Sequence, residues 1–206
     1  MPAPQRSNPA YRAIARLVRP VMMLVTRRDW HGAEHLPRDG GFIAVANHMT
    51  NVDPLTFAHF LYDNGVAPKV LAKSSLFAVP VLGRLLRASG QIPVFRNSAR
   101  AGESLVAAEA ALADGECVAV FPEGTFTGDP DLWPMVGKTG AARLSIESGC
   151  PIVPVAIVGV ERMFARFPRR TRVVIEVCAP IHPQAGDTPL DLTERLMFTL
   201  AAHLPE

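Results

Sequence analysis

A histidine and an aspartate lie five positions apart, at His48 and Asp53, directly after the apolar run Phe42–Ala46. A carboxylate at this spacing can accept a hydrogen bond from one imidazole nitrogen. That bond fixes the tautomer and leaves the other nitrogen to take a proton from a hydroxyl group. The pair is therefore a candidate for a catalytic base and the group that orients it. An aspartate that caps a helix beside a loop histidine would give the same pattern.

A second polar segment, Phe121-Pro122-Glu123-Gly124-Thr125, also follows a short apolar run. It places a carboxylate, a hydroxyl and backbone N–H groups at the carboxyl end of a predicted strand, where open α/β sheets bind ligands. An ordinary turn could have this composition too. The chain shows no serine or cysteine in a recognisable nucleophile elbow. A base at His48 would therefore act on the substrate directly, without a covalent enzyme intermediate.

Strands and helices are predicted to alternate around these two segments. Strands are expected at residues 42–46, 69–72, 91–95, 117–121, 152–158 and 172–177, and helices at 8–28, 53–61, 98–113, 139–148 and 191–202, with short helical pieces over 76–86. Asp53 is expected at an N-cap and Pro54 at the first helical position. The chain of 206 residues is thus predicted to form a single α/β domain with a mixed, mostly parallel sheet flanked by helices.

The N-terminal region carries a local positive charge. Residues 1–28 contain no acidic residue, and the arginines there are Arg6, Arg12, Arg16, Arg19, Arg27 and Arg28. On a helix, Arg12, Arg16 and Arg19 share one face and apolar residues share the opposite face, although Pro20 would bend or end such a helix. Such a helix can lie in the interface of an anionic membrane, or it can pack on the core with its arginines in solvent.

Composition limits the other possibilities. Hydrophobic residues make up 49% of the chain and the mean hydropathy is +0.17. The longest stretch without charge, residues 148–160, is too short to span a bilayer. The three cysteines are widely spaced in apolar runs, which favours buried free thiols over disulfides. Gly137-Lys138-Thr139 is similar to the end of a nucleotide-binding P-loop, but Leu132 stands at the first glycine position, which excludes that site.

Four segments together resemble the glycerolipid acyltransferase family, of the 1-acylglycerol-3-phosphate acyltransferase type. Asn47–Asp53 is similar to the motif N-H-x-[ST]-x-x-D, and Phe121–Thr125 matches F-P-E-G-T. Gly90–Arg96 resembles a glycine-led strand that ends in arginine, and Ile152–Ala156 resembles an apolar V-P-V strand. Each motif is short, but all four occur in the family's order.

The resemblance implies a role for each matching residue. His48 would be the general base on a glycerol hydroxyl, with Asp53 orienting it. Arg96 would bind the substrate phosphate, because a planar guanidinium matches phosphate oxygens. Glu123, Gly124 and Thr125 would complete the acceptor site, and Pro154 would shape the cleft. Apart from the family's motifs, Lys73 and Lys138 are further candidates for binding anionic groups, or are solvated surface lysines.

The resemblance also implies an activity. The chain would move a fatty acyl group from acyl-CoA to 1-acylglycerol 3-phosphate (lysophosphatidic acid), forming phosphatidic acid in phospholipid biosynthesis, with no metal or cofactor. An acyl carrier protein could replace coenzyme A, and glycerol 3-phosphate or another lysophospholipid could be the acceptor. A hydrolase, in which His48 activates water against a thioester, is the alternative from another class. Residues 1–28 would bind an anionic membrane surface peripherally on its cytoplasmic face, residues 29–206 would form the catalytic domain, and no nucleic acid partner is expected.

Overall fold

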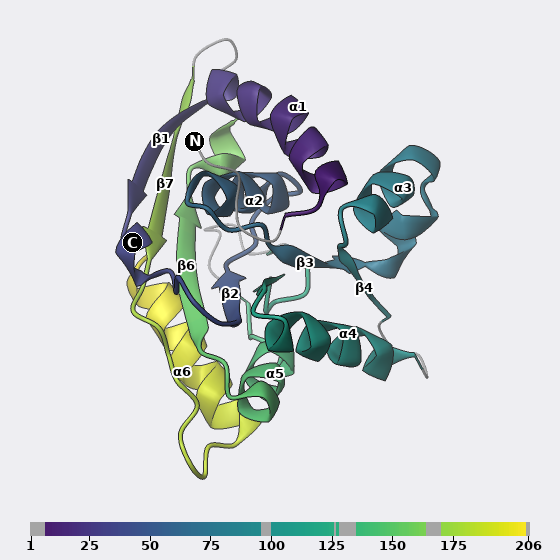
Figure 1. Ribbon diagram of the computed structural model, residues 1–206. Coiled ribbons are helices and arrows are strands. Elements are labelled where there is room, and N and C mark those ends of the chain that lie inside the picture. Colours follow the sequence, from purple (N-terminus) through teal and green to yellow (C-terminus); the bar gives the residue numbers. More distant parts are fainter. Residues whose placement is uncertain (1–6, 96–99, 126, 128–134, 164–169, 205–206) are drawn as a thin grey trace.

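A seven-stranded sheet runs through the middle of the molecule, with helices on both of its faces (Figure 1). The computed structural model describes residues 7–95, 100–125, 127, 135–163 and 170–204. The order of the strands in the sheet is β1-β7-β6-β2-β5-β3-β4. Among the strands that the structure describes, β6 and β7 pair antiparallel and all other neighbours pair parallel. The predicted mixed, mostly parallel α/β sheet is therefore confirmed.

Strand bounds lie close to those expected from the apolar runs. The strands are β1 (Thr26–His31), β2 (Phe42–Ala46), β3 (Lys69–Lys73), β4 (Ile92–Val94), β5 (Cys117–Val120), β6 (Ile152–Val158) and β7 (Thr171–Val177). The central strand β2 is buried along its whole length, as expected for a parallel strand covered on both faces. The parallel strands β2, β5, β3 and β4 all end at the same edge of the sheet.

Alternating side chains of β2 divide the core into two layers. Ala44 and Ala46 face a cluster built with α1 (Pro9–Val25) and α2 (Asp53–Asp63). Ile43 and Val45 face a second cluster built with α4 (Ala101–Ala113), α5 (Gly140–Ser148) and α6 (Pro189–Ala202). Figure 1 shows these two groups of helices on opposite faces of the sheet. The period of two along the strand therefore produces a three-layer arrangement.

One close approach between layers depends on a glycine. A Cβ atom at Gly41, directly before β2, would lie 2.3 Å from the carbonyl oxygen of Leu112 in α4. No side chain fits at that distance, so Gly41 allows α4 to pack tightly at the start of the central strand.

The N-terminal helix is shorter than predicted. It begins after Asn8, whose side chain accepts a hydrogen bond from Tyr11 N–H, and it ends at Val25. Residues 26–28, predicted as helix, instead start β1, which pairs with β7. Pro20 does not end the helix: it lies inside it, at an exposed position.

The apolar segment before β4 forms the predicted short helical pieces. They are a 3₁₀ helix, Ser74–Ala78, followed by α3 (Pro80–Ala88). Figure 1 shows α3 at the side of the domain, next to the first turn of α1. Among the helices that the structure describes, none combines the length and hydrophobicity needed to cross a bilayer.

Candidate active site

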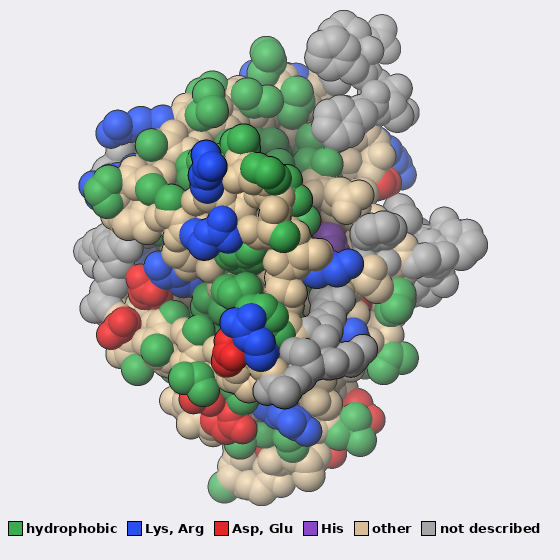
Figure 2. All heavy atoms as spheres, turned by 90° about the vertical axis from the view of Figure 1, so that its right-hand side faces the viewer, with side chains coloured by type: hydrophobic (Ala, Val, Ile, Leu, Met, Phe, Trp, Pro, Cys, Tyr) green, Lys and Arg blue, Asp and Glu red, His purple; other side chains and the backbone are tan. Residues whose placement is uncertain are grey.

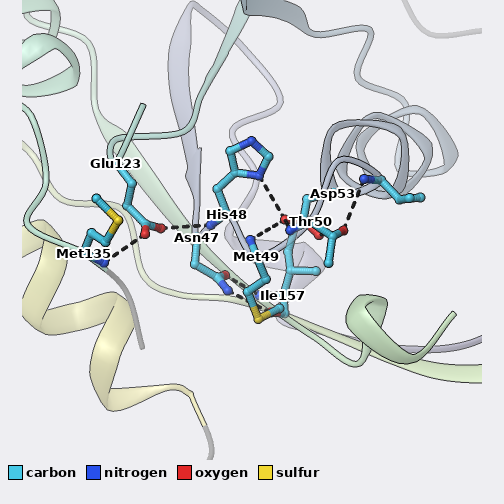
Figure 3. Close-up of polar contacts among 9 residues, drawn as sticks. Asn47, His48, Met49, Thr50, Asp53, Glu123, Met135 and Ile157 are labelled. Carbon is cyan, nitrogen blue, oxygen red and sulfur yellow. Dashed lines mark hydrogen bonds and ion pairs between the residues drawn. The ribbon is translucent and has the colours of Figure 1, made fainter. Parts of the chain in front are cut away.

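The side chains of His48 and Asp53 lie together at the carboxyl end of β2. His48 Nδ1 is 3.0 Å from Asp53 Oδ2, and Asp53 is fully buried. Figure 3 shows the second ring nitrogen of His48 on the side of the imidazole away from Asp53. When Nδ1 carries the proton donated to the carboxylate, Nε2 has the lone pair. The geometry therefore suits a base that is oriented by a buried carboxylate.

Asp53 holds the whole loop between β2 and α2. Its carboxylate accepts hydrogen bonds from Met49 N–H and from both the N–H and the hydroxyl of Thr50. The sequence predicted Asp53 as the N-cap of α2, and this prediction is wrong by one position. Val52 is the cap residue and Asp53 is the first residue of the helix. The carboxylate is used by the preceding loop and by His48, so it is not available to cap its own helix.

Glu123 fixes the backbone on which His48 stands. It is 1% exposed, and its two carboxylate oxygens accept hydrogen bonds of 2.9 Å from the N–H groups of His48 and Met135 (Figure 3). Burial raises the pKa of Glu123, and these two hydrogen bonds partly oppose the rise. Both oxygens are engaged by the protein, so this geometry favours a positioning role over the predicted contact with the acceptor.

Asn47 and Phe121 contact the surroundings of His48. Both belong to the family's motifs, but the sequence predicted no role for them. The buried side chain of Asn47 exchanges two hydrogen bonds with the backbone of Ile157 in β6, of 2.9 Å and 2.8 Å. The ring of Phe121 lies against the ring of His48, with 4.4 Å between the centroids. These contacts join the ends of three adjacent strands, β5, β2 and β6, around the imidazole.

His48 lines a largely apolar cavity of about 510 Å³, which we call the first cavity. Its wall is formed by α1, α2, β3 and the segment around α3, including Tyr11, Val18, Leu55, Leu76 and Leu86. The volume lies within the range of small-molecule sites, roughly 300–1,000 Å³. A hydrocarbon chain in this cavity would therefore end beside the candidate base.

A polar cluster around the buried carboxylate of Asp63 adjoins the first cavity. The carboxylate of Asp63 accepts hydrogen bonds from Arg19, at 2.6 Å, and from Arg28, at 2.8 Å. His59 Nε2 lies 3.6 Å from the same carboxylate, and burial lowers the pKa of His59. The cluster connects α1, β1 and α2. Arg19, predicted on a membrane-facing basic side, therefore pairs with a buried carboxylate while its own side chain stays partly exposed.

The lysines predicted to bind anions lie on different sides of the site. Lys73, at the end of β3, lines the first cavity together with His48. Lys138 and Gly124 line a second cavity, on the other side of Phe121. The N–H of Gly124, which has φ +74°, donates to the carbonyl of Phe121 and so belongs to the turn. Thr125, after it, is exposed.

Of the two remaining predicted residues, the structure describes only Pro154, which is not brought to the site. Pro154 is buried within β6, opposite Val45 of β2, and it lines neither of the two cavities. The structure therefore places it in the sheet instead of the predicted cleft. Arg96 lies outside the described residues. Among those that are described, no group of three or more histidine, cysteine, aspartate or glutamate side chains is arranged to hold a metal ion.

Comparison with known proteins agrees with this arrangement. An acyltransferase family matches residues 27–158, which contain the His48–Asp53 pair and Glu123. The crystal structure of the 1-acyl-sn-glycerophosphate acyltransferase of Thermotoga maritima has a TM-score of 0.74 with this chain at 23% identity, covering 93% of this chain and 77% of that one. This likeness shows that the two proteins share a fold.

Named relatives are similar over about two thirds of the chain. A 1-acyl-sn-glycerol-3-phosphate acyltransferase of Borreliella burgdorferi is 31% identical over 136 residues, 66% of this chain and 52% of that protein. The chloroplastic enzyme of this name from Brassica napus is 30% identical over 139 residues, 66% of this chain and 39% of that protein. The chain thus spans about half or less of the length of these relatives. Since the family matches more than half of it, the chain belongs to the glycerolipid acyltransferase family.

Proposed function

We propose that this chain transfers a fatty acyl group from acyl-CoA to the free hydroxyl of 1-acylglycerol 3-phosphate, forming phosphatidic acid. The observation that carries the proposal is that His48, paired with the buried Asp53, lines an apolar cavity of about 510 Å³. The names of the Borreliella burgdorferi and Brassica napus relatives support the choice of acceptor. Acyl carrier protein is the alternative donor.

The proposed reaction is a direct transfer between two substrates. His48 Nε2 takes the proton from the acceptor hydroxyl as its oxygen attacks the thioester carbon. The carbon–sulfur bond then breaks, and the imidazolium returns the proton to the thiolate, which leaves as a free thiol. Asp53 keeps Nδ1 protonated and stabilises the positive charge on the imidazolium. A general base placed in this way contributes on the order of 10²–10⁴-fold to the rate.

Positive charges on both sides of the base support a phosphate-bearing acceptor. Lys73 lines the first cavity and Lys138 lines the second, and the sequence adds Arg96 after β4. A phosphate monoester needs such charge-assisted hydrogen bonds once water is displaced. Glycerol 3-phosphate and other lysophospholipids present the same headgroup chemistry in part, so they are the competing acceptors.

We also propose that the enzyme works on the surface of an anionic membrane. The structure describes exposed apolar side chains on α1 (Leu17, Val21 and Leu24) and around α3 (Leu76, Val79, Val81, Leu82 and Leu85). Figure 2 shows hydrophobic side chains gathered on the upper part of the face that α3 presents, with lysine and arginine side chains among them. Such a mixture suits peripheral attachment to anionic lipids. We propose that the enzyme binds the cytoplasmic surface of the membrane.

The activity is tested by thiol release from palmitoyl-CoA with and without lysophosphatidate, combined with analysis of the lipid product. Wild type should release thiol only with the acceptor, and His48→Ala should lose most of that rate. A panel of glycerol 3-phosphate, other lysophospholipids and acyl carrier protein thioesters then ranks acceptors and donors. Thiol release that does not depend on any acceptor would support a thioester hydrolase and overturn the proposal.

Membrane attachment is tested by sedimentation with vesicles that contain anionic lipid. Changing Leu17, Val21 and Leu24 to serine should weaken binding at all salt concentrations, and Arg16→Glu should weaken it mainly at low salt. Phe198→Ser, an equally exposed apolar position on α6 and on the opposite face of the sheet, is the matched control. Unchanged sedimentation of the α1 variants, or an equal loss in the control, would contradict this attachment.

A further inference from the structure

Two cavities lie on opposite sides of Phe121, and only the first contains His48. The second cavity has a volume of about 390 Å³ and lies between the ends of β3, β4 and β5 and the helices α4 and α5. Phe121 lines both cavities, and its ring contacts the imidazole of His48. The proposed roles of His48 and Asp53 assign no ligand to the second cavity. Because Phe121 lines both cavities, a ligand in the second cavity would contact the ring that packs against His48.

The second cavity has a charged end and an apolar interior. Lys138 is exposed, whereas Ala108 and Leu144 are each 1% exposed, so the lining runs from solvent into the core. The hydroxyl of Ser104 donates to Pro93 O and accepts from Phe95 N–H, so it needs no hydrogen bond from a ligand. An apolar cavity of this kind accepts a hydrocarbon chain more readily than water.

The proposed reaction requires space for two hydrocarbon chains. One belongs to the acyl donor, whose thioester carbon must reach His48, and the other is already attached to the acceptor. The first cavity opens directly on His48 and so suits the donor chain. A glycerol backbone beside Gly124 and Thr125 would place the acceptor phosphate toward Lys138 and its chain between α4 and α5.

We therefore propose that the second cavity binds the acyl chain of the lysophospholipid acceptor. This inference rests on the proposed function and deepens it, because it explains how the site would select an acceptor that already carries one chain. Each methylene of the acceptor that enters the cavity should raise kcat/KM about fourfold, from the free energy of burying a methylene group. Glycerol 3-phosphate, which has no chain, gains nothing from the cavity.

Narrowing the second cavity tests this assignment. Ala108→Leu fills it from α4, and Leu105→Phe enlarges a half-buried neighbour in case the first variant folds poorly. Steady-state rates are measured with lysophosphatidates of increasing chain length at a fixed donor, and with acyl-CoA donors of increasing length at a fixed acceptor. In both variants, kcat/KM should fall about tenfold for long-chain acceptors and should change least for glycerol 3-phosphate. The dependence of the rate on donor chain length should stay as in wild type.

Two control variants make the result specific. Ala107→Leu, an exposed position on the same helix, should leave both profiles as in wild type. Ala58→Leu narrows the first cavity and should instead shift the donor profile toward shorter chains. A changed donor profile in the Ala108 and Leu105 variants, or an unchanged acceptor profile in folded protein, would overturn the assignment. Failure of wild type to acylate any acceptor would instead refute the proposed function.

Discussion

Replacing Glu123 by glutamine distinguishes a positioning residue from a residue that binds the acceptor. Each carboxylate oxygen of Glu123 accepts one backbone N–H, from His48 and from Met135. Glutamine has one oxygen and an NH₂ group, so one of these two N–H groups would face another donor. Leaving a buried N–H without a partner costs about 1–3 kcal/mol. Because the amide avoids burying a charge, we expect a loss of unfolding free energy near the lower end of that range.

The effect on catalysis should be larger than the effect on stability. If the N–H of His48 loses its acceptor, the end of β2 shifts and the imidazole moves relative to the substrate hydroxyl. A displacement of about 1 Å can reduce the rate on the order of 10²-fold. We expect kcat to fall on the order of 10–100-fold in Glu123→Gln, while KM for lysophosphatidate stays close to wild type. Initial rates over a range of acceptor concentrations, together with urea unfolding, measure both quantities.

The opposite kinetic pattern would refute this reasoning. A variant with unchanged kcat and a raised KM for the acceptor would show that Glu123 contributes substrate binding, as its motif alone suggests. Glu194→Gln is the matched control, since Glu194 is an exposed glutamate on α6 and lies outside the site. It should leave kcat, KM and the urea midpoint unchanged.

The remaining predictions concern the loop between β2 and α2, the neighbouring Asn47, and the polar cluster around Asp63. Asp53→Asn should reduce kcat on the order of 10²–10⁴-fold, because an amide does not hold His48 in the required tautomer. The rate of acceptor-dependent thiol release measures this loss. Asn47→Leu removes both hydrogen bonds to buried backbone groups of Ile157 and should lower the unfolding free energy by about 1–3 kcal/mol or more. Burial lowers the pKa of His59 below its usual 6.5, so the unfolded chain binds protons more tightly and stability should fall as the pH drops below that value. His59→Phe, which keeps an aromatic ring beside Trp30, should weaken this fall in pH-dependent urea unfolding, and an unchanged slope would contradict the assignment.

The contact between His48 and Asp53 could be predicted because the two residues lie five positions apart in one loop. His48 and Asp53 are close in sequence, and an apolar run fixes the strand before them. The carboxylate of Glu123 is different, because one of its partners is twelve residues later at Met135. No local pattern shows that a carboxylate after a strand is buried and satisfied by backbone N–H groups. Its positioning role therefore became visible only in three dimensions.

The edge strand β1 is a part of the fold that local sequence could not predict. Its sequence, Thr26-Arg27-Arg28-Asp29-Trp30-His31, is polar and continues directly from an amphipathic helix. An edge strand that pairs on one side needs no alternating apolar pattern, and the register with β7 is set by contacts far along the chain. The central strands β2, β5 and β6 were predicted because both of their faces are buried, which leaves long apolar runs.

The direct passage from α1 into β1 has a mechanical consequence. The helix ends at Val25 and the strand begins at Thr26, whose hydroxyl donates to Met22 O in the last turn of the helix. Arg19 and Arg28, on either side of this junction, hold the same carboxylate of Asp63 in α2. These contacts thus fasten α1 to both β1 and α2. A surface that bound α1 would therefore also determine the tilt of the sheet and the height of His48 above that surface.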